Sequence, residues 1–188
     1  MANTNAPFGF RPIGHMTGGA VRLREYSIAS AYATSIFLGD VVEMTGTGTN
    51  IAQAAAANAD NIGVFAGCRY VDAQGNQIFS KYWPASTTAT DIVAYVYDDP
   101  DIIFEAQVST IAAADIGNLM DIAVGTGSTL TGISAAYLDE STKATTGTTF
   151  RVLDLKPSPD NAYGAYAKVR CVFAEHVLKG VVAGVGGI

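Results

Sequence analysis

The chain has few charged residues. Only 15% of its 188 residues are Asp, Glu, Lys or Arg, against about 25% in an ordinary globular domain. The 17 acidic residues outnumber the 11 basic ones, and the densest basic pair, Arg22 and Arg24, is followed at once by Glu25. Because proteins that grip phosphates need several positive charges together, we expect no direct binding to nucleic acid or to an acidic membrane surface.

Cysteine and histidine are also scarce. Cys68, Cys171, His15 and His176 are the whole inventory, and no pair of them has the C-x₂₋₄-C or H-x₃₋₅-H spacing of a zinc site. Two distant cysteines do not make the disulfide scaffold of a small secreted protein, so we expect reduced thiols. Neither a metal nor another cofactor is predicted.

Long apolar runs are missing. No stretch of about 18 consecutive apolar residues occurs, so no transmembrane helix is expected. Residues 1–14 lack the apolar core of a secretory signal peptide. We therefore expect a protein that is made in the cytoplasm and leaves the cell only by lysis.

Long stretches of helical periodicity are missing as well, whereas short segments that alternate between apolar and polar residues are frequent. Gly, Pro, Asn and Asp separate these segments, as they do between strands. Strands are expected at residues 21–28, 35–44, 61–72, 77–84, 91–97, 101–108, 118–124, 134–139, 149–155 and 165–173. The helix candidates are the short segments 52–57 and 109–115. This pattern predicts an all-β fold: a jelly roll, a sandwich or a barrel-like domain.

Both ends of the chain differ from this body, which we expect to span residues 21–178 as a single domain. Residues 1–20 are predicted to form an extended N-terminal arm, because their Gly and Pro residues oppose regular structure. Residues 179–188 are predicted to form a flexible, apolar, Gly-rich C-terminal tail. Apolar segments left in water promote aggregation, so we expect arm and tail to be covered by their own domain or by a neighbour. The candidate partner-binding residues are Pro7, Phe8, Phe10, Arg11, Pro12, Val181, Val182 and Val185.

The stretch DDPDIIFEAQV, residues 98–108, holds the richest group of candidate catalytic carboxylates: Asp98, Asp99, Asp101 and Glu105. The alternating spacing of a calcium-binding loop is absent. Asp and Pro are the residues that a tight turn between two strands requires. On the strand that follows, Glu105 should lie on the solvent side, opposite Phe104. We therefore predict a structural turn and no enzyme, with a bound cation or a catalytic pair as the alternatives.

Other motifs for catalysis and binding are incomplete. The stretches GTGTNI (46–51) and GTGSTL (125–130) lack the third glycine of a dinucleotide-binding loop and open no predicted helix. No G-x-S-x-G nucleophile motif occurs. Tyr82 and Trp83 could stack on a sugar, although aromatic residues of β proteins lie more often in a core or an interface.

Several segments resemble small structural proteins of tailed bacteriophages. They are APFGFRPIGH (6–15), LGDVV (38–42), DDPDIIFEAQ (98–107), GSTLTGIS with LDESTKATTGTT (127–149), and LKPSPDNAYGAYAK (155–168). The resemblance runs from about residue 5 to residue 176 and is to capsid cement, or head decoration, proteins. It implies a non-enzymatic virion protein on the outer surface of the icosahedral head, assembled in the host cytoplasm. The implied partners are the major capsid protein, whose neighbouring subunits it clamps in the expanded shell, and its own copies in a homotrimer.

Three other functions stay open. The first is another phage structural role, as a head–tail or tail protein, since fold alone does not set function. The second is a carbohydrate-acting β domain that uses Asp98, Asp99, Asp101 or Glu105. The third is a carbohydrate-binding module that uses Tyr82 and Trp83.

Overall fold

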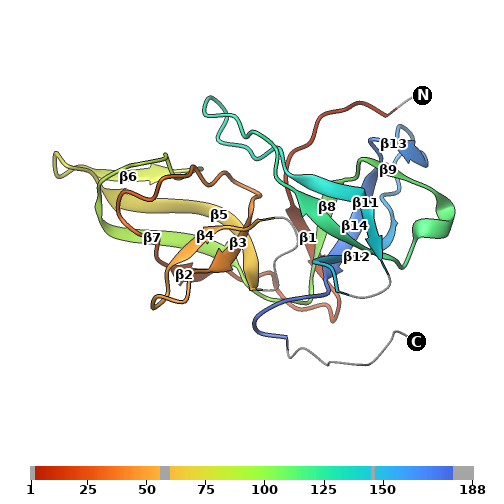
Figure 1. The fold of residues 1–188 in the computed structure, drawn as a ribbon, viewed down its shortest axis with the longest axis horizontal. Helices are drawn as coiled ribbons and strands as arrows, with labels where there is room; N and C mark the ends of the chain where they lie inside the picture. The colour runs from red at the N-terminus through yellow and green to blue at the C-terminus, as the bar shows by residue number, and fades with distance from the viewer. Residues whose placement is uncertain (1–2, 56–59, 145–146, 180–188) are drawn as a thin grey trace.

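The computed structural model describes residues 3–55, 60–144 and 147–179. The chain forms two six-stranded antiparallel sheets that pack as a sandwich-like β domain (Figure 1), which confirms the all-β prediction. The strands are β1 (Arg11–His15), β2 (Arg24–Tyr26), β3 (Val41–Met44), β4 (Ile51–Gln53), β5 (Asn61–Val71), β6 (Gln77–Ser80), β7 (Thr90–Tyr97), β8 (Ile102–Gln107), β9 (Thr110–Ile111), β10 (Leu119–Ala123), β11 (Tyr137–Ala144), β12 (Phe150–Leu155), β13 (Gly164–Ala165) and β14 (Lys168–Phe173). The one helical element among the described residues is a 3-10 turn, η1 (Ala113–Asp115).

Each sheet occupies one half of the molecule. The β5 sheet, on the left in Figure 1, has the order β2-β7-β5-β3-β4, with β6 also paired to β5. The β8 sheet, on the right, has the order β1-β8-β14-β12-β10-β11. A two-stranded ribbon of β9 and β13 lies beside the β8 sheet. Strands β7 and β8 lie in different sheets, so the acidic turn between them is a connection from one sheet to the other.

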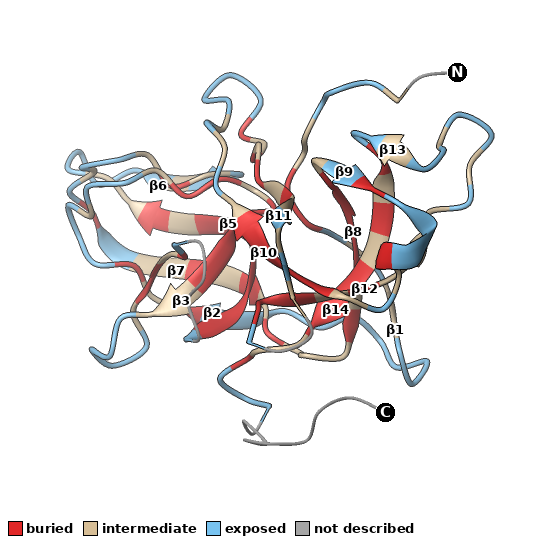
Figure 2. Ribbon diagram, turned by 45° about the vertical axis from the view of Figure 1, so that its right-hand side comes forward, coloured by how far each residue is buried: buried red, intermediate tan, exposed pale blue. Residues whose placement is uncertain are grey.

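Two apolar clusters form the core, whose strands are drawn as buried in Figure 2. One contains residues of both sheets, and the other lies within the β5 sheet and its loops. In the β8 sheet, the rings of Phe150 and Phe173 lie 4.2 Å apart between centroids, and Phe104 meets both rings edge-on. In the β5 sheet, the fully buried Trp83 meets Tyr70 edge-on. Burial of each such side chain stabilises the fold by about 1.5–3 kcal/mol.

Two predicted turns are confirmed. The β5–β6 hairpin closes at Gly75-Asn76, where Gly75 has φ +83°. Asp72 Oδ1 accepts hydrogen bonds from the backbone N–H groups of Gln74 and Asn76. Residues 98–101 likewise connect β7 to β8, as their Asp and Pro content predicts.

The prediction that residues 1–20 lack regular structure is wrong for residues 11–15, which form β1. Strand β1 pairs with β8 at the edge of its sheet, and an edge strand tolerates Pro12 because one side of it needs no ladder hydrogen bonds. Phe10, just before it, is 1% exposed and stacks on Phe150 with a centroid distance of 4.4 Å. Part of the predicted arm therefore belongs to the β body.

The first helix prediction is wrong in the described residues, and the second, of one or two turns, is met only by the single 3-10 turn η1. The first candidate, 52–57, overlaps β4, and its last two residues lie outside the described ranges. The second candidate, 109–115, splits into β9 and η1. Short Ala-rich segments carry too little helix propensity to resist pairing with a neighbouring strand.

The prediction of reduced cysteines is confirmed. Cys68 is buried in the cluster of the β5 sheet and Cys171 in the cluster that contains residues of both sheets, and both thiols are free. Burial raises the pKa of the Cys68 thiol to about 12. In the described part of the chain, none of the helical structure has the length and apolar character needed to cross a membrane.

Candidate functional site

The acidic turn between β7 and β8 is occupied by internal contacts. Asp98 Oδ2 accepts a hydrogen bond from the hydroxyl of Tyr26 at 2.9 Å and lies 3.0 Å from Nε of Arg24. Asp99 Oδ1 accepts a hydrogen bond from the backbone N–H of Asp101, and Asp99 Oδ2 lies 3.0 Å from Nε2 of His15. Residues 3–55, 60–144 and 147–179 contain no group of three or more potential metal ligands. The contacts of Asp98 and Asp99 tie β2 and β1 to the β7–β8 connection.

The prediction that Glu105 lies on the solvent side is wrong. Glu105 is 5% exposed, and Oε1 lies 2.7 Å from Nζ of Lys156. Lys156 follows β12, two places from β8 in the sheet, and its side chain reaches across to cover Glu105. The prediction that Phe104 lies on the opposite, apolar side is confirmed, since its side chain belongs to the core.

Buried groups near the turn have shifted pKa values. Burial, reinforced by the neighbouring Asp98 carboxylate, raises the pKa of Tyr26 to about 12. Burial lowers the pKa of His176 to about 4. The pKa of Asp99 is lowered, first by the hydrogen bond from the Asp101 backbone and also by His15. The lowered pKa keeps His176 neutral at pH 7 and in mild acid, whereas Tyr26 is neutral and Asp99 charged at pH 7 even at their ordinary pKa values.

An exposed leucine stands at the tip of a braced loop. The Leu130 loop, residues 124–136, connects β10 to β11 and rises at the top of Figure 1. Backbone hydrogen bonds from Ser128 to Ile133 and from Gly132 to Ser128 close its tip, while Leu38 pairs with Ile133 at its base. Leu130 itself is 94% exposed. The loop therefore holds an apolar side chain in solvent, away from the apolar core of the protein.

A buried carboxylate anchors this loop. Asp40, 2% exposed, accepts hydrogen bonds from the hydroxyl of Ser134, the backbone N–H of Phe37 and the side-chain amide of Gln53. Its pKa is raised by burial, against which all three hydrogen bonds act. A buried, fully hydrogen-bonded polar group holds its neighbours in one arrangement.

Exposed apolar side chains also lie on the two segments that contact Asp101 in the acidic turn; we call Met16, Val177 and Leu178 the turn patch. The backbone N–H of Met16 donates to the carbonyl of Asp101, and Nζ of Lys179 lies 3.4 Å from Oδ1 of the same residue. All three members of the patch are about half exposed. The end of β1 and the segment that leads into the C-terminal tail therefore meet at this turn.

The fold brings four of the predicted partner-binding residues, Phe8, Phe10, Arg11 and Pro12, to one groove and places Pro7 elsewhere. Phe8, Arg11 and Pro12 line a groove of about 280 Å³ between the two halves of the molecule, and the guanidinium of Arg11 lies 4.6 Å from the ring centroid of Phe8. Pro7 lines a different pocket. Phe10 is a core residue, so burial removes it from the surface available to a partner. Val181, Val182 and Val185 lie outside the described residues.

The suggestion that Tyr82 and Trp83 stack on a sugar is wrong. Trp83 is fully buried against Tyr70, and Tyr82 stacks on Phe37 with a centroid distance of 5.3 Å. A carbohydrate-binding module that uses this pair would need the ring faces in water.

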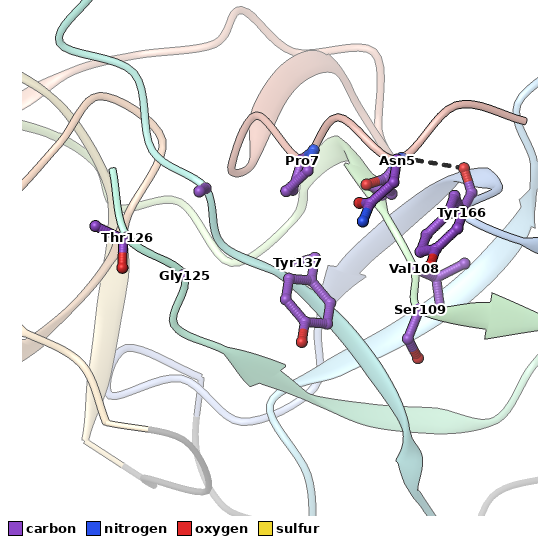
Figure 3. A pocket seen from close by; sticks show the side chains of 10 residues that line it. Asn5, Pro7, Val108, Ser109, Gly125, Thr126, Tyr137 and Tyr166 are labelled. Carbon is purple, nitrogen blue, oxygen red and sulfur yellow. Dashed lines mark hydrogen bonds between the residues drawn. The ribbon is translucent and has the colours of Figure 1, made fainter. Parts of the chain in front are cut away.

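The pocket that Pro7 lines lies beside the Leu130 loop (Figure 3) and has a volume of about 570 Å³. Its lining residues are Asn5, Pro7, Gln107, Val108, Ser109, Gly125, Thr126, Ala135, Tyr137 and Tyr166. These residues come from five separate segments, so no sequence motif marks the pocket. Comparison of the chain with known protein families, curated proteins and solved structures found no match.

Proposed function

We propose that this protein is a capsid cement protein, which binds the outside of a phage head and clamps neighbouring subunits of the major capsid protein. The observation that carries the proposal is a pair of apolar contact sites on opposite sides of a β body. The Leu130 loop rises at the top of Figure 1, and the segment of the turn patch that leads to the C-terminus lies at the bottom. Exposed apolar groups of this kind are typical of protein–protein contact sites.

The construction of both sites supports a clamping role. Asp40 and the pairing of Leu38 with Ile133 hold the Leu130 loop, while the acidic turn holds the ends that carry the turn patch. Two contact points fixed on one body match subunits at one separation only. Such a protein stabilises the expanded shell over the unexpanded shell, because it binds the arrangement whose spacing it fits.

The low charge and the resemblance to cement proteins complete the proposal. The protein would act without catalysis, cofactor or nucleic acid, on the outer surface of the virion, and as a homotrimer. Val181, Val182 and Val185, in the Gly-rich sequence after Lys179, stay candidate contacts to a neighbouring subunit.

The test is binding of purified protein to expanded heads that lack it, measured by co-sedimentation. Leu130→Asp and Met16→Asp should each lower occupancy at least tenfold, because each buries a charge in an apolar contact. Gln77→Asp adds the same charge at an exposed position of β6 and should bind as the unaltered protein does. Unchanged occupancy for both Leu130→Asp and Met16→Asp would refute the two-site clamp.

A further inference from the structure

The pocket of Figure 3 lies under the N-terminal segment and shares Gly125, Thr126 and Ala135 with the Leu130 loop. Its volume of about 570 Å³ lies within the range of roughly 300–1,000 Å³ that is usual for small-molecule sites. We propose that it binds a neutral saccharide of one or two sugar units. Leu130 itself does not line the pocket, so saccharide binding and the proposed clamp use different side chains.

The chemistry of the lining selects the ligand class. None of the ten described lining residues is Asp, Glu, Lys, Arg or His, so the pocket offers no counter-charge to an ionic ligand. It offers instead two phenol groups, from Tyr137 and Tyr166, together with the hydroxyls of Ser109 and Thr126 and the amide of Asn5. A tyrosine ring packs on apolar surface while its hydroxyl exchanges hydrogen bonds. A sugar presents this combination, with C–H faces and a rim of hydroxyl groups.

Tyr166 is held in a strained backbone conformation at the edge of the pocket. Its φ of +60° lies in the left-handed region, which a bulky residue seldom adopts. Both of its backbone groups are fixed: its N–H donates to the carbonyl of Ser109, and its carbonyl accepts from Nε2 of Gln107. Strain that the surrounding contacts impose is typical of functional positions. A glycine would adopt this φ without strain, so the backbone conformation itself does not account for a tyrosine at this position.

The N-terminal segment is fastened as a wall of the pocket. Nε2 of Gln107, a buried side chain, also donates to the carbonyl of Thr4 at 2.9 Å. Nδ2 of Asn3 donates to the carbonyls of Ala162 and Ala165, and Oδ1 of Asn3 accepts from the backbone N–H of Ala162. Asn5 and Pro7 are thereby placed across from Tyr137, as Figure 3 shows. The pocket is formed in advance of any ligand.

An extended peptide fits this pocket less well than a sugar. A peptide that adds to a sheet needs a row of free backbone donors and acceptors. Here the backbone N–H of Val108 donates to Ala167, that of Ser109 donates to Leu138, and that of Tyr166 donates to Ser109. With these groups already paired, recognition falls to side chains, which suits a ligand rich in hydroxyl groups.

The test uses the full-length ¹⁵N-labelled protein, titrated with glucose, galactose, mannose, N-acetylglucosamine and their β-linked dimers. At least one of these probes should shift the amide signals of residues 107–109 and 137 in a saturable manner. Tyr137→Ala and Tyr166→Gly should abolish the shifts, and Tyr166→Gly should keep or raise Tm because glycine relieves the positive φ. Tyr163→Ala, an exposed tyrosine outside the pocket, is the matched control and should bind normally.

Three results would overturn the proposal. The first is the absence of saturable shifts with every sugar of the panel. The second is binding that survives both Tyr137→Ala and Tyr166→Gly. The third is a response confined to an uncharged peptide with the sequence of residues 180–188, which would assign the pocket to a second copy of the chain.

Discussion

Nε2 of His15 lies 3.0 Å from Oδ2 of Asp99, and this pair fastens the end of β1 to the turn between β7 and β8. The two residues are 84 positions apart in the chain. They join the β8 sheet, which contains β1, to the connection that comes from the β5 sheet. Asp98 extends the junction to β2 through Tyr26 and Arg24.

Loss of the Asp99 carboxylate should destabilise the fold in a pH-dependent manner. Because the pKa of Asp99 is lowered in the folded state, its stabilisation is present above the unfolded pKa of about 3.9 and is lost as pH falls through the lowered folded value. Asp99→Asn should lower the free energy of unfolding by about 0.5–1 kcal/mol at pH 7, as is usual for a partly exposed pair. Urea unfolding at pH 7 and at about pH 2 measures the effect.

The matched control for Asp99 is Glu25→Gln, which removes one carboxylate at an exposed position of β2. It should leave the free energy of unfolding nearly unchanged at both pH values. An Asp99→Asn variant as stable as the control at pH 7 would show that the His15–Asp99 pair does not hold the junction.

His176 should make the fold weaken in mild acid. The folded-state pKa is lowered to about 4 by burial, whereas an unfolded histidine has a pKa of about 6.5. The unfolded state therefore binds more protons between these values, and stability falls as pH drops through this window by at most about 1.4 kcal/mol per pH unit.

His176→Asn tests this assignment, since the asparagine oxygen can replace Nδ1 as acceptor of the hydrogen bond from the backbone N–H of Leu178. Whatever its effect at pH 7, the variant should lose that part of the slope of unfolding free energy that arises between about pH 6.5 and pH 4. Equal slopes for the variant and the unaltered protein would assign the acid sensitivity to other groups.

Gly9 should be indispensable for seating the N-terminal segment. It has φ +75°, and a Cβ atom at this position would lie 2.6 Å from the carbonyl oxygen of Gly39. That contact is with backbone, and Gly39 itself lies in the left-handed region, at φ +94°. Gly9→Ala should therefore lower the free energy of unfolding by about 1–3 kcal/mol.

Gly14→Ala is the matched control for Gly9, because a Cβ atom at Gly14 meets nothing within 4 Å. This variant should stay within about 0.5 kcal/mol of the unaltered protein. Thermal unfolding of the two variants side by side gives the comparison, and equal Tm values would contradict the tight crossing of the segments around Gly9 and Gly39.

Local sequence patterns predicted most of the strands. Alternation and turn residues located β5, β6 and the turn at Gly75-Asn76, because in a hairpin the partners are neighbours in the chain. The same rules misplaced β1, whose strand character depends on β8, a segment some 90 residues away, as the pairing of Arg11 with Glu105 illustrates. Phe10 was predicted to bind another protein for the same reason, because Phe150, the residue on which its ring stacks, is distant in the chain.

The candidate sites were harder to predict than the strands. The turn at Asp98–Asp101 was recognised from its Asp and Pro residues, but its role as a junction depends on His15 and Arg24, which only the fold brings near. Glu105 was predicted to face solvent because the alternation of apolar and polar residues gives the two faces of a single strand. It does not show that the Lys156 side chain, from another part of the chain, covers Glu105. The pocket of Tyr137 and Tyr166 gathers five segments, and its one local signal, the positive φ of Tyr166, is not visible in a sequence.

The measurement that tests the central claim most directly is the number of copies bound per expanded head, obtained by titrating purified protein onto undecorated heads and quantifying both proteins after sedimentation. A cement protein should saturate at hundreds of copies per head, and light scattering of the free protein should give the mass of a trimer. Saturation at about six to twelve copies, the number set by a closed ring at one vertex, or no binding at all, would contradict the account.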